Sequence, residues 1–291
     1  MAGGGGHESY ISPPLTGVWW DLNTCPVPDD FDPRCVDRCI KSALHEQIRI
    51  PTAVAIYAIG NLEYMSLDLL EKISSSGIAL IHAPCGGNNL INFLYEWSDE
   101  QQHEPSRPGS GYIMLISGDS TMVNRCRLKE FSKFSKICAY PKAVGPVTTL
   151  DNQGEKVFVK ELVWETLLSV NPSPCVTREA DEEPCMCQVC HVVSETCKDF
   201  VTHLRSEQHR ARLFGIVPVD YDGNPRYFCP VCNYPAYDEF NMSLHNESED
   251  HIHKLADKEQ PPQAEDCESR KRNPQVDLFN EINKKQSLER P

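Results

Sequence analysis

Between Leu15 and about Val170, short apolar runs alternate with longer segments in which apolar residues recur at helical spacing. The runs are typical of buried strands, and the periodic segments are typical of amphipathic helices. The predicted strands are Gly17–Trp20, Thr52–Ile59, Ile78–Ala83, Tyr112–Ser117 and Ile137–Tyr140. The predicted helices are Pro33–Gln47, Met65–Ser75, Asn89–Trp97, Met122–Phe134 and a last one near Glu155–Leu168. This alternation predicts an α/β fold with a mostly parallel sheet and helices on both faces.

Less regular segments set the expected domain boundaries. Residues 1–14 contain the run Gly3–Gly6 and are expected to form a disordered leader, because glycine is too permissive to order itself. The polar segment from Ser98 to Gly111 is expected to be a surface loop, and 171–184, with prolines near both ends, to be a linker. The predicted domains are therefore 15–170, 185–214 and 227–255. The polar tail 256–291 is expected to be disordered.

Overall composition narrows the class of protein. The formal net charge of -14 over 291 residues argues against an indiscriminate binder of nucleic acid or of anionic membranes. No signal peptide precedes the 14 cysteines, and no stretch approaches the roughly 18 consecutive apolar residues of a membrane span. We therefore expect an intracellular protein, in the nucleus or the cytoplasm, with no membrane partner. In a reducing compartment, paired cysteines bind metal more often than they form disulfides.

A repeated cysteine and histidine pattern carries the strongest signal in the chain. Two segments share the spacing C-x2-C-x12-H-x5-H, which lets a hairpin present two thiolates and the following helix two imidazoles to one Zn²⁺ ion. The first predicted site is Cys187, Cys190, His203 and His209, and the second is Cys229, Cys232, His245 and His251. His253 remains an alternative to His251. The spacing predicts two structural zinc sites in ββα-type fingers, with Cys175, Cys185, Cys197 and Cys267 as free thiols.

Two acids occupy matching places one residue past an apolar strand. Asp21 follows the run that ends at Trp20, and Asp119 follows the run that ends near Ser117. If their strands are neighbours, the two carboxylates can hold a divalent cation such as Mg²⁺, which often takes only one or two protein carboxylates. An alternative interpretation is structural, with Asp21 accepting turn amides and Asp119 capping the next helix.

Positive charge gathers in two places of an otherwise acidic chain. Arg125, Lys129 and Lys133 recur every four residues on a predicted helix, with Arg127 beside them, and would suit a phosphate backbone. A solvated helix face would explain the same pattern. In the first finger Arg205, Arg210 and Arg212 are candidates for nucleic-acid contacts, whereas the second finger is acidic and is expected to be a structural or protein-binding module.

The motifs VWWDLNTCPVP, LIHAP and LISGDS, taken in order, resemble the NYN domain, a PIN-like ribonuclease fold. The form is that of relatives of meiosis regulator and mRNA stability factor and of plant proteins that join the domain to zinc fingers. The resemblance covers about Leu15 to Val170. It implies a Mg²⁺- or Mn²⁺-dependent endonuclease that cuts single-stranded RNA, with Asp21 and Asp119 among its catalytic acids. It also leaves peroxisome association and pairing into a homodimer open.

The family pattern is only partly retained. Thr121 and Met122 stand where the pattern S-G-D-x-D-F has Asp and Phe, and Asn23 and Thr24 replace its Glu-Asn pair. The acid before the third helix is missing, and the segment CGGNNLIN offers Asn88, Asn89 and Asn92. The wide histidine gap in HLRSEQHRARL is similar to that of matrin-like and double-stranded-RNA-binding fingers, which implies structured RNA as a partner of the first finger.

Three hypotheses follow from the sequence. The first is a metal-dependent endoribonuclease, weakened by its lost acids, whose fingers and basic helix position RNA. The second is a catalytically inactive RNA-binding or adaptor protein that acts in the post-transcriptional regulation of gene expression. The third is a DNA-binding regulator built on the fingers.

Overall fold

The structure is a computed structural model of the chain. It describes residues 15–48, 53–84, 87–103, 111–120, 122, 131, 133–145, 158–169 and 183–259. The chain divides into two units, residues 1–252 and 253–291. In the second unit the described residues are 253–259, the end of a helix, so the first unit contains all the elements discussed below.

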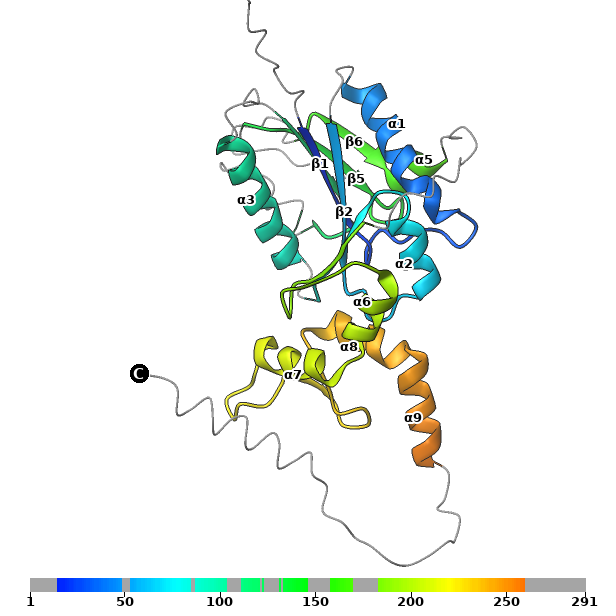
Figure 1. The fold of residues 1–291 in the computed structure, drawn as a ribbon, viewed down its shortest axis with the longest axis vertical. Coiled ribbons are helices and arrows are strands. Elements are labelled where there is room, and N and C mark those ends of the chain that lie inside the picture. Colours follow the sequence, from blue (N-terminus) through cyan, green and yellow to red (C-terminus); the bar gives the residue numbers. More distant parts are fainter. Residues whose placement is uncertain are drawn as a thin grey trace, which may run out of the picture. The chain divides into compact units, whose positions relative to one another are not determined.

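An eight-stranded sheet organises the first unit (Figure 1). Its strands follow the order β6-β5-β4-β1-β2-β3-β7-β8, and all neighbouring pairs are parallel except β7 and β8. The strands are β1 (Leu15–Asp21), β2 (Ala53–Gly60), β3 (Ala79–His82), β4 (Tyr112–Ile116), β5 (Ser135–Tyr140), β6 (Lys160–Val163), β7 (Cys185–Cys187) and β8 (Val192–Ser194). The predicted α/β class with a mostly parallel sheet is confirmed.

Helices cover both faces of the sheet. In Figure 1, α3 (Gly87–His103) lies on one side, and α1 (Val36–Ile48), α2 (Leu67–Ser74) and α5 (Trp164–Leu168) lie on the other. A single 3-10 turn, η1 (Pro33–Cys35), leads into α1, with Pro33 in its first turn and Asp32 capping it through the amide of Arg34. Ser66 caps α2 in the same way through the amide of Leu69.

Two apolar cores fill the layers, and adjacent tryptophans of β1 point into different ones. Trp19 packs with Trp97 of α3 in the first layer, at a ring distance of 4.9 Å. Trp20 packs with Trp164 of α5 in the second, at 5.2 Å. This alternation follows from the strand period of two. Both Trp20 and Trp164 also donate to backbone carbonyls of the loop after β1, at Cys25 and Pro26, and so fix that loop.

Two secondary-structure predictions, one of a loop and one of a helix, differ from the structure. The polar segment expected to be a loop from Ser98 begins as helix, because α3 continues to His103. Glu, Gln, Ser and Asp on the exposed side of a helix give the same composition as a loop. The helix expected near Glu155–Leu168 contains a sixth parallel strand, β6, before the short α5. The predicted helix Met122–Phe134 lies mostly outside the described residues.

The C-terminal part of the first unit consists of two ββα segments. The first contains β7, β8, α6 (Cys197–Leu204) and α7 (Glu207–Ile216). The second contains β9 (Tyr227–Cys229), β10 (Tyr234–Ala236), α8 (Glu239–Glu247) and the start of α9 (Glu249–Glu259). Thr196, Ser206 and Asp238 cap α6, α7 and α8, which explains why each helix begins where it does.

The first ββα segment is part of the central sheet. Its strand β7 pairs in parallel with β3, with Leu80 opposite Cys185 and His82 opposite Cys187, and the amide of Gln188 donates to His82 at 3.0 Å. The apolar core under α1 and α2 continues into both segments through Phe200, Leu213 and Tyr234. The expected boundary at 171–184 therefore separates two stretches of sequence that share one sheet.

Candidate metal centres and strand-end acids

The first predicted metal site is assembled from three elements. Cys187 ends β7, Cys190 lies in the turn that follows, His203 is on α6 and His209 is on α7. Nδ1 of His209 lies 3.5 Å from Sγ of Cys187 and 3.4 Å from Sγ of Cys190. One ligand atom from each of the four residues lies within 4.8 Å of the others, so the group can hold a metal ion.

The second predicted site repeats this geometry. Cys229 ends β9, Cys232 follows in the turn, His245 is on α8, and His251 is on α9. Nδ1 of His251 lies 3.5 Å from Sγ of Cys229 and 3.4 Å from Sγ of Cys232. The fourth member of the group is therefore His251 and not His253.

These distances fit zinc. With Zn–S near 2.3 Å and Zn–N near 2.0 Å, a tetrahedral ion separates its sulfur and nitrogen ligands by about 3.5 Å. The four sulfur–nitrogen separations of 3.4 and 3.5 Å agree with that value. Nε2 of His203 is buried, and the described part of the chain gives it no hydrogen-bond partner, as expected for an atom that faces an ion. Two thiolates and two imidazoles are also a donor set that zinc prefers.

Burial favours the neutral, metal-binding form of the histidines in the first group, but it disfavours the thiolate form of Cys187. Burial lowers the pKa of His209 to about 4, so this side chain is neutral at pH 7, as a ligand must be. Burial raises the pKa of Cys187 to about 12, so its thiol keeps its proton in the metal-free chain. A bound cation would reverse this preference, and its binding would release protons.

His82, at the end of β3, is the residue near this group that the sequence did not reveal. It is fully buried, and its Nδ1 accepts the amide of Leu62 at 3.1 Å. Its ring lies 5.0 Å from that of His209, and burial holds its pKa well below the usual range. An isolated histidine in a strand has no spacing signal, because the pairing of β3 with β7 is what brings it to the metal group.

Two further thiols lie in the same segment. Cys185 and Cys197 are buried, and their sulfur atoms are 3.5 Å apart. Neither takes part in a disulfide, as predicted.

The strand order places the predicted acids at a topological switch point. β1 lies between β2 and β4, so the connections from β1 and β4 leave the sheet in different directions at the carboxyl ends of the strands. Open parallel sheets bind ligands in the crevice at such a point. Asp21 ends β1, and Asp119 lies three residues past the end of β4. The two strands that precede these acids, β1 and β4, are neighbours in the sheet.

The carboxylate of Asp21 is held by four internal donors. Oδ1 accepts the amides of Asn23 at 3.1 Å and Thr24 at 3.3 Å. Oδ2 accepts the hydroxyls of Thr24 at 2.5 Å and Ser117 at 3.0 Å. A carboxylate has about four acceptor positions, so these donors fill them. Burial raises the pKa of Asp21, and the hydrogen bonds from Thr24 and Ser117 oppose that effect.

Asp119 belongs to the loop that Thr24 and Ser117 tie to β1. Its amide donates to Oγ of Ser117 at 3.0 Å, and the amide of Gly118 donates to Oγ1 of Thr24 at 2.9 Å. The side chain of Asp119 is partly exposed. Among the described residues, groups of three or more close metal-ligating side chains occur in the two ββα segments, and none of them includes Asp21 or Asp119.

The predicted nucleic-acid contacts are only partly placed. Arg125, Arg127 and Lys129 lie outside the described residues, as do the side chains of Asn88 and Asn89, whereas Lys133 and Asn92 are exposed. In the first ββα segment, Arg205, in the turn after α6, and Arg212, on α7, are exposed, and Arg210 is half-buried. Of the aromatic residues in the second segment, Tyr234 is buried and Phe228 is 40% exposed.

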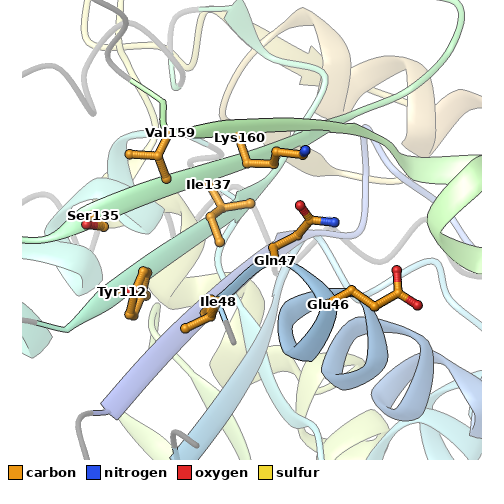
Figure 2. A pocket seen from close by; sticks show the side chains of 8 residues that line it. All are labelled: Glu46, Gln47, Ile48, Tyr112, Ser135, Ile137, Val159 and Lys160. Atoms are coloured by element: carbon orange, nitrogen blue, oxygen red, sulfur yellow. The ribbon is translucent and has the colours of Figure 1, made fainter. Parts of the chain in front are cut away.

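One pocket lies at the other end of the strands. Tyr112, Ser135 and Lys160, which begin β4, β5 and β6, line it together with Glu46, Gln47 and Ile48 from the end of α1 (Figure 2). Its volume is about 440 Å³. Because it lies at the amino ends of parallel strands, it is separate from the edge that carries Asp21.

No family model matches the chain, and no curated protein matches it. None of the described helices combines the length and the apolar character needed to cross a bilayer.

Proposed function

We propose that this protein is an RNA-binding protein, stabilised by two zinc ions, whose PIN-like domain does not cleave RNA. The observation that carries the proposal is the set of four donors around Asp21. A divalent ion at this carboxylate would have to displace at least one of them. Catalysis of phosphodiester cleavage depends mainly on charge placed around the reacting phosphate, and with the acid before the third helix missing, Asp119 is the one other acid of the nuclease pattern that this chain retains.

Two residues that depart from the nuclease pattern lie against the Asp21 carboxylate. Asn23 and Thr24 stand in place of the Glu-Asn pair of the NYN pattern. Their amides and the Thr24 hydroxyl provide three of the four donors to Asp21. The two amides belong to the backbone, so the donor that this difference in sequence adds is the Thr24 hydroxyl. The difference thus removes a candidate acidic ligand and adds an internal hydrogen bond to Asp21, which supports a structural use of Asp21.

RNA binding rests on local charge. Three cationic side chains of the first ββα segment are exposed, although the chain as a whole is acidic. They are Lys198 on α6, Arg205 in the turn after α6, and Arg212 on α7. Exposed cations on two adjacent helices favour a phosphate backbone. The resemblance to NYN domains and to RNA-binding fingers makes RNA the nucleic acid we propose, with structured RNA at the first finger.

A second candidate function is a metal-dependent endoribonuclease. The specific observation in its favour is the position of Asp21 beside the Ser117–Asp119 loop at the switch point of the sheet, where α/β proteins bind ligands. In this alternative, RNA and Mg²⁺ or Mn²⁺ displace Thr24 or Ser117 from the carboxylate, and Asp119 provides the second acid.

Binding is tested with the full zinc-loaded chain and fluorescently labelled single-stranded and hairpin RNAs. Arg205→Ala/Arg212→Ala should weaken binding and lower the slope of log affinity against log salt by about 2. Arg34→Ala/Lys72→Ala is the matched control, because it removes the same charge from two residues in surface ion pairs elsewhere in the domain. No binding by the wild type, or equal loss in the control, would overturn the proposal.

Cleavage is tested on the same RNAs in Mn²⁺. We expect intact RNA with the wild type. Cleavage that Asp119→Asn abolishes, with unchanged folding, would replace the proposal with the second candidate. Asp119 is the better position for this substitution, because changing Asp21 also disturbs the hydrogen bonds that join two loops.

A further inference from the structure

The loop that follows β2 reaches the second metal group. The hydroxyl of Tyr64 lies 3.2 Å from Nδ1 of His245, one of the four predicted ligands. The ring of Tyr234 stacks on the imidazole of the same His245, with ring centroids 4.5 Å apart and ring planes 7° from parallel. The hydroxyl of Tyr234 in turn donates to Oε2 of Glu63 at 2.7 Å. Tyr64 therefore contacts the imidazole of His245 directly, and Glu63 holds the tyrosine that stacks on it.

The helix that carries His245 is anchored to the same domain one turn earlier. Asn241 is buried, and its Nδ2 donates to the carbonyl of Pro84, after β3, at 2.7 Å. Its Oδ1 accepts Nδ2 of Asn61, after β2, at 2.7 Å. Because Asn241 and His245 are four residues apart on α8, they share one face of the helix. That face is turned toward the α/β domain.

The tautomer of His245 follows from these contacts. A metal-bound imidazole uses one ring nitrogen for the ion and donates the other N–H to an outer partner, which fixes its orientation. Tyr64 occupies the side of Nδ1, so Nε2 is the atom left for the ion. Such outer partners change metal affinity by about 10- to 100-fold when removed.

We propose that the α/β domain supplies the outer hydrogen-bonding shell of the second zinc centre, with Tyr64 as the positioning residue for His245. Zinc binding at this centre then stabilises the docked arrangement of the loop 61–64, and docking raises zinc affinity, because the two equilibria are linked. By this inference the second ββα segment stabilises the α/β domain. This assignment is independent of whether the protein binds RNA.

The test measures zinc affinity of the full chain, prepared metal-free under reducing conditions, against a chromophoric chelator. The wild type should bind two equivalents. Tyr64→Phe should weaken one equivalent by about 10- to 100-fold and leave the other unchanged. Tyr221→Phe is the matched control, since it removes the same hydroxyl from a fully exposed side chain. With Co²⁺ in place of zinc, only Tyr64→Phe should shift the visible absorption of one equivalent, because His245 is reoriented.

Unchanged affinity of both equivalents in Tyr64→Phe would overturn the proposal, and so would equal weakening of both, which would indicate a general loss of folding. A measurement on the unaltered chain covers the case in which the variant does not fold. Addition of the second zinc equivalent should slow hydrogen exchange at residues 61–64 as well as within 227–251. Slowing confined to 227–251 would also overturn it.

Discussion

The imidazole of His82 lies edge-on to that of His209, with ring centroids 5.0 Å apart and planes at 69°. The first histidine ends a strand of the α/β sheet, and the second is a predicted zinc ligand on α7. Since Nδ1 of His82 also accepts the amide of Leu62, one buried ring joins the loop after β2 to the metal group. The sheet and the first metal centre should therefore gain and lose stability together.

Replacing His82 tests this connection. His82→Ala should lower the free energy of unfolding by about 2–4 kcal/mol, because it leaves a cavity beside His209 and a buried amide without its acceptor. Urea unfolding of the zinc-loaded chain measures the change. His45→Ala, at an exposed position of α1, should stay within about 0.5 kcal/mol of the wild type. A similar small effect for His82→Ala would contradict the connection.

Removal of zinc should destabilise the sheet as well as the ββα segments. A ligand at about 1,000 times its Kd stabilises a folded protein by about 4 kcal/mol, and β7 transmits this effect to β3 through the strand pairing. Chelation should shift a single cooperative thermal transition to lower temperature, as followed by circular dichroism. If the metal-free chain instead unfolds in two steps, with the upper step at the temperature of the zinc-loaded protein, the segments are independent of the sheet.

Truncation before the first ββα segment should cause aggregation. A chain that ends at residue 184 lacks β7 and leaves β3, whose residues 80–82 are buried in the full sheet, as an exposed apolar edge. Light scattering and size-exclusion chromatography should show large species. A chain that ends at residue 259 keeps all the described elements and is the control. A soluble, monomeric 1–184 fragment would show that β7 is dispensable.

The contact between Glu63 and Tyr234 predicts a pH dependence. Burial raises the pKa of Glu63 from 4.5 to about 7, and the hydrogen bond from Tyr234 and the charges of Arg210 and Arg205 oppose this. Between these pH values the folded chain holds a proton that the unfolded chain has lost, so this residue's contribution to stability falls as pH rises.

Glu63→Gln keeps an acceptor for Tyr234 without the charge. Its melting temperature should exceed that of the wild type at pH 8, and the difference should shrink as the pH falls toward 5. Glu46→Gln, at an exposed position, should show no such trend. A difference for Glu63→Gln that is the same at both pH values would contradict the assignment.

Asp21 should behave as a structural residue. Asp21→Asn replaces one carboxylate oxygen, which accepts hydrogen bonds, with an NH2 group, which would face donors instead. We therefore expect the free energy of unfolding to fall by about 1–3 kcal/mol. Urea unfolding measures it, with the exposed Asp29→Asn as control. A stability equal to that of the wild type would mean that the four donors tolerate an amide, and would weaken the argument against a metal at this position.

Local patterns predicted most of the α/β domain because its strands are buried on both faces. The runs ending at Trp20, Ile59 and Ala83 are almost entirely apolar, as strands covered on both faces require. The two Cys/His groups were predictable for a different reason. One small fold fixes the spacing of the four residues in each group, so residues such as Cys187 and His203 can be recognised from their spacing alone.

Contacts between distant segments were not predictable. β6 reads as part of a helix because Lys160 and Glu161 suit either structure, and only pairing with β5 decides it. Likewise, Asn61 and Asn241 carry no motif, and their hydrogen bond exists because two loops of the sheet meet α8. The sequence placed Asp21 at the end of a strand, but it did not show that the carboxylate is engaged in internal hydrogen bonds such as the one from Ser117.

The pairing of β3 with β7 also has a consequence for biosynthesis. His82 and Cys187 are partners in the sheet but are about 100 residues apart in the chain. At about 5–20 residues per second, a ribosome needs roughly 5–20 s to make the intervening segment. During that time the nascent α/β domain has β3 as an open edge, which is a site for chaperone binding or for pairing between neighbouring nascent chains. Completion of the first Cys/His segment ends this exposure.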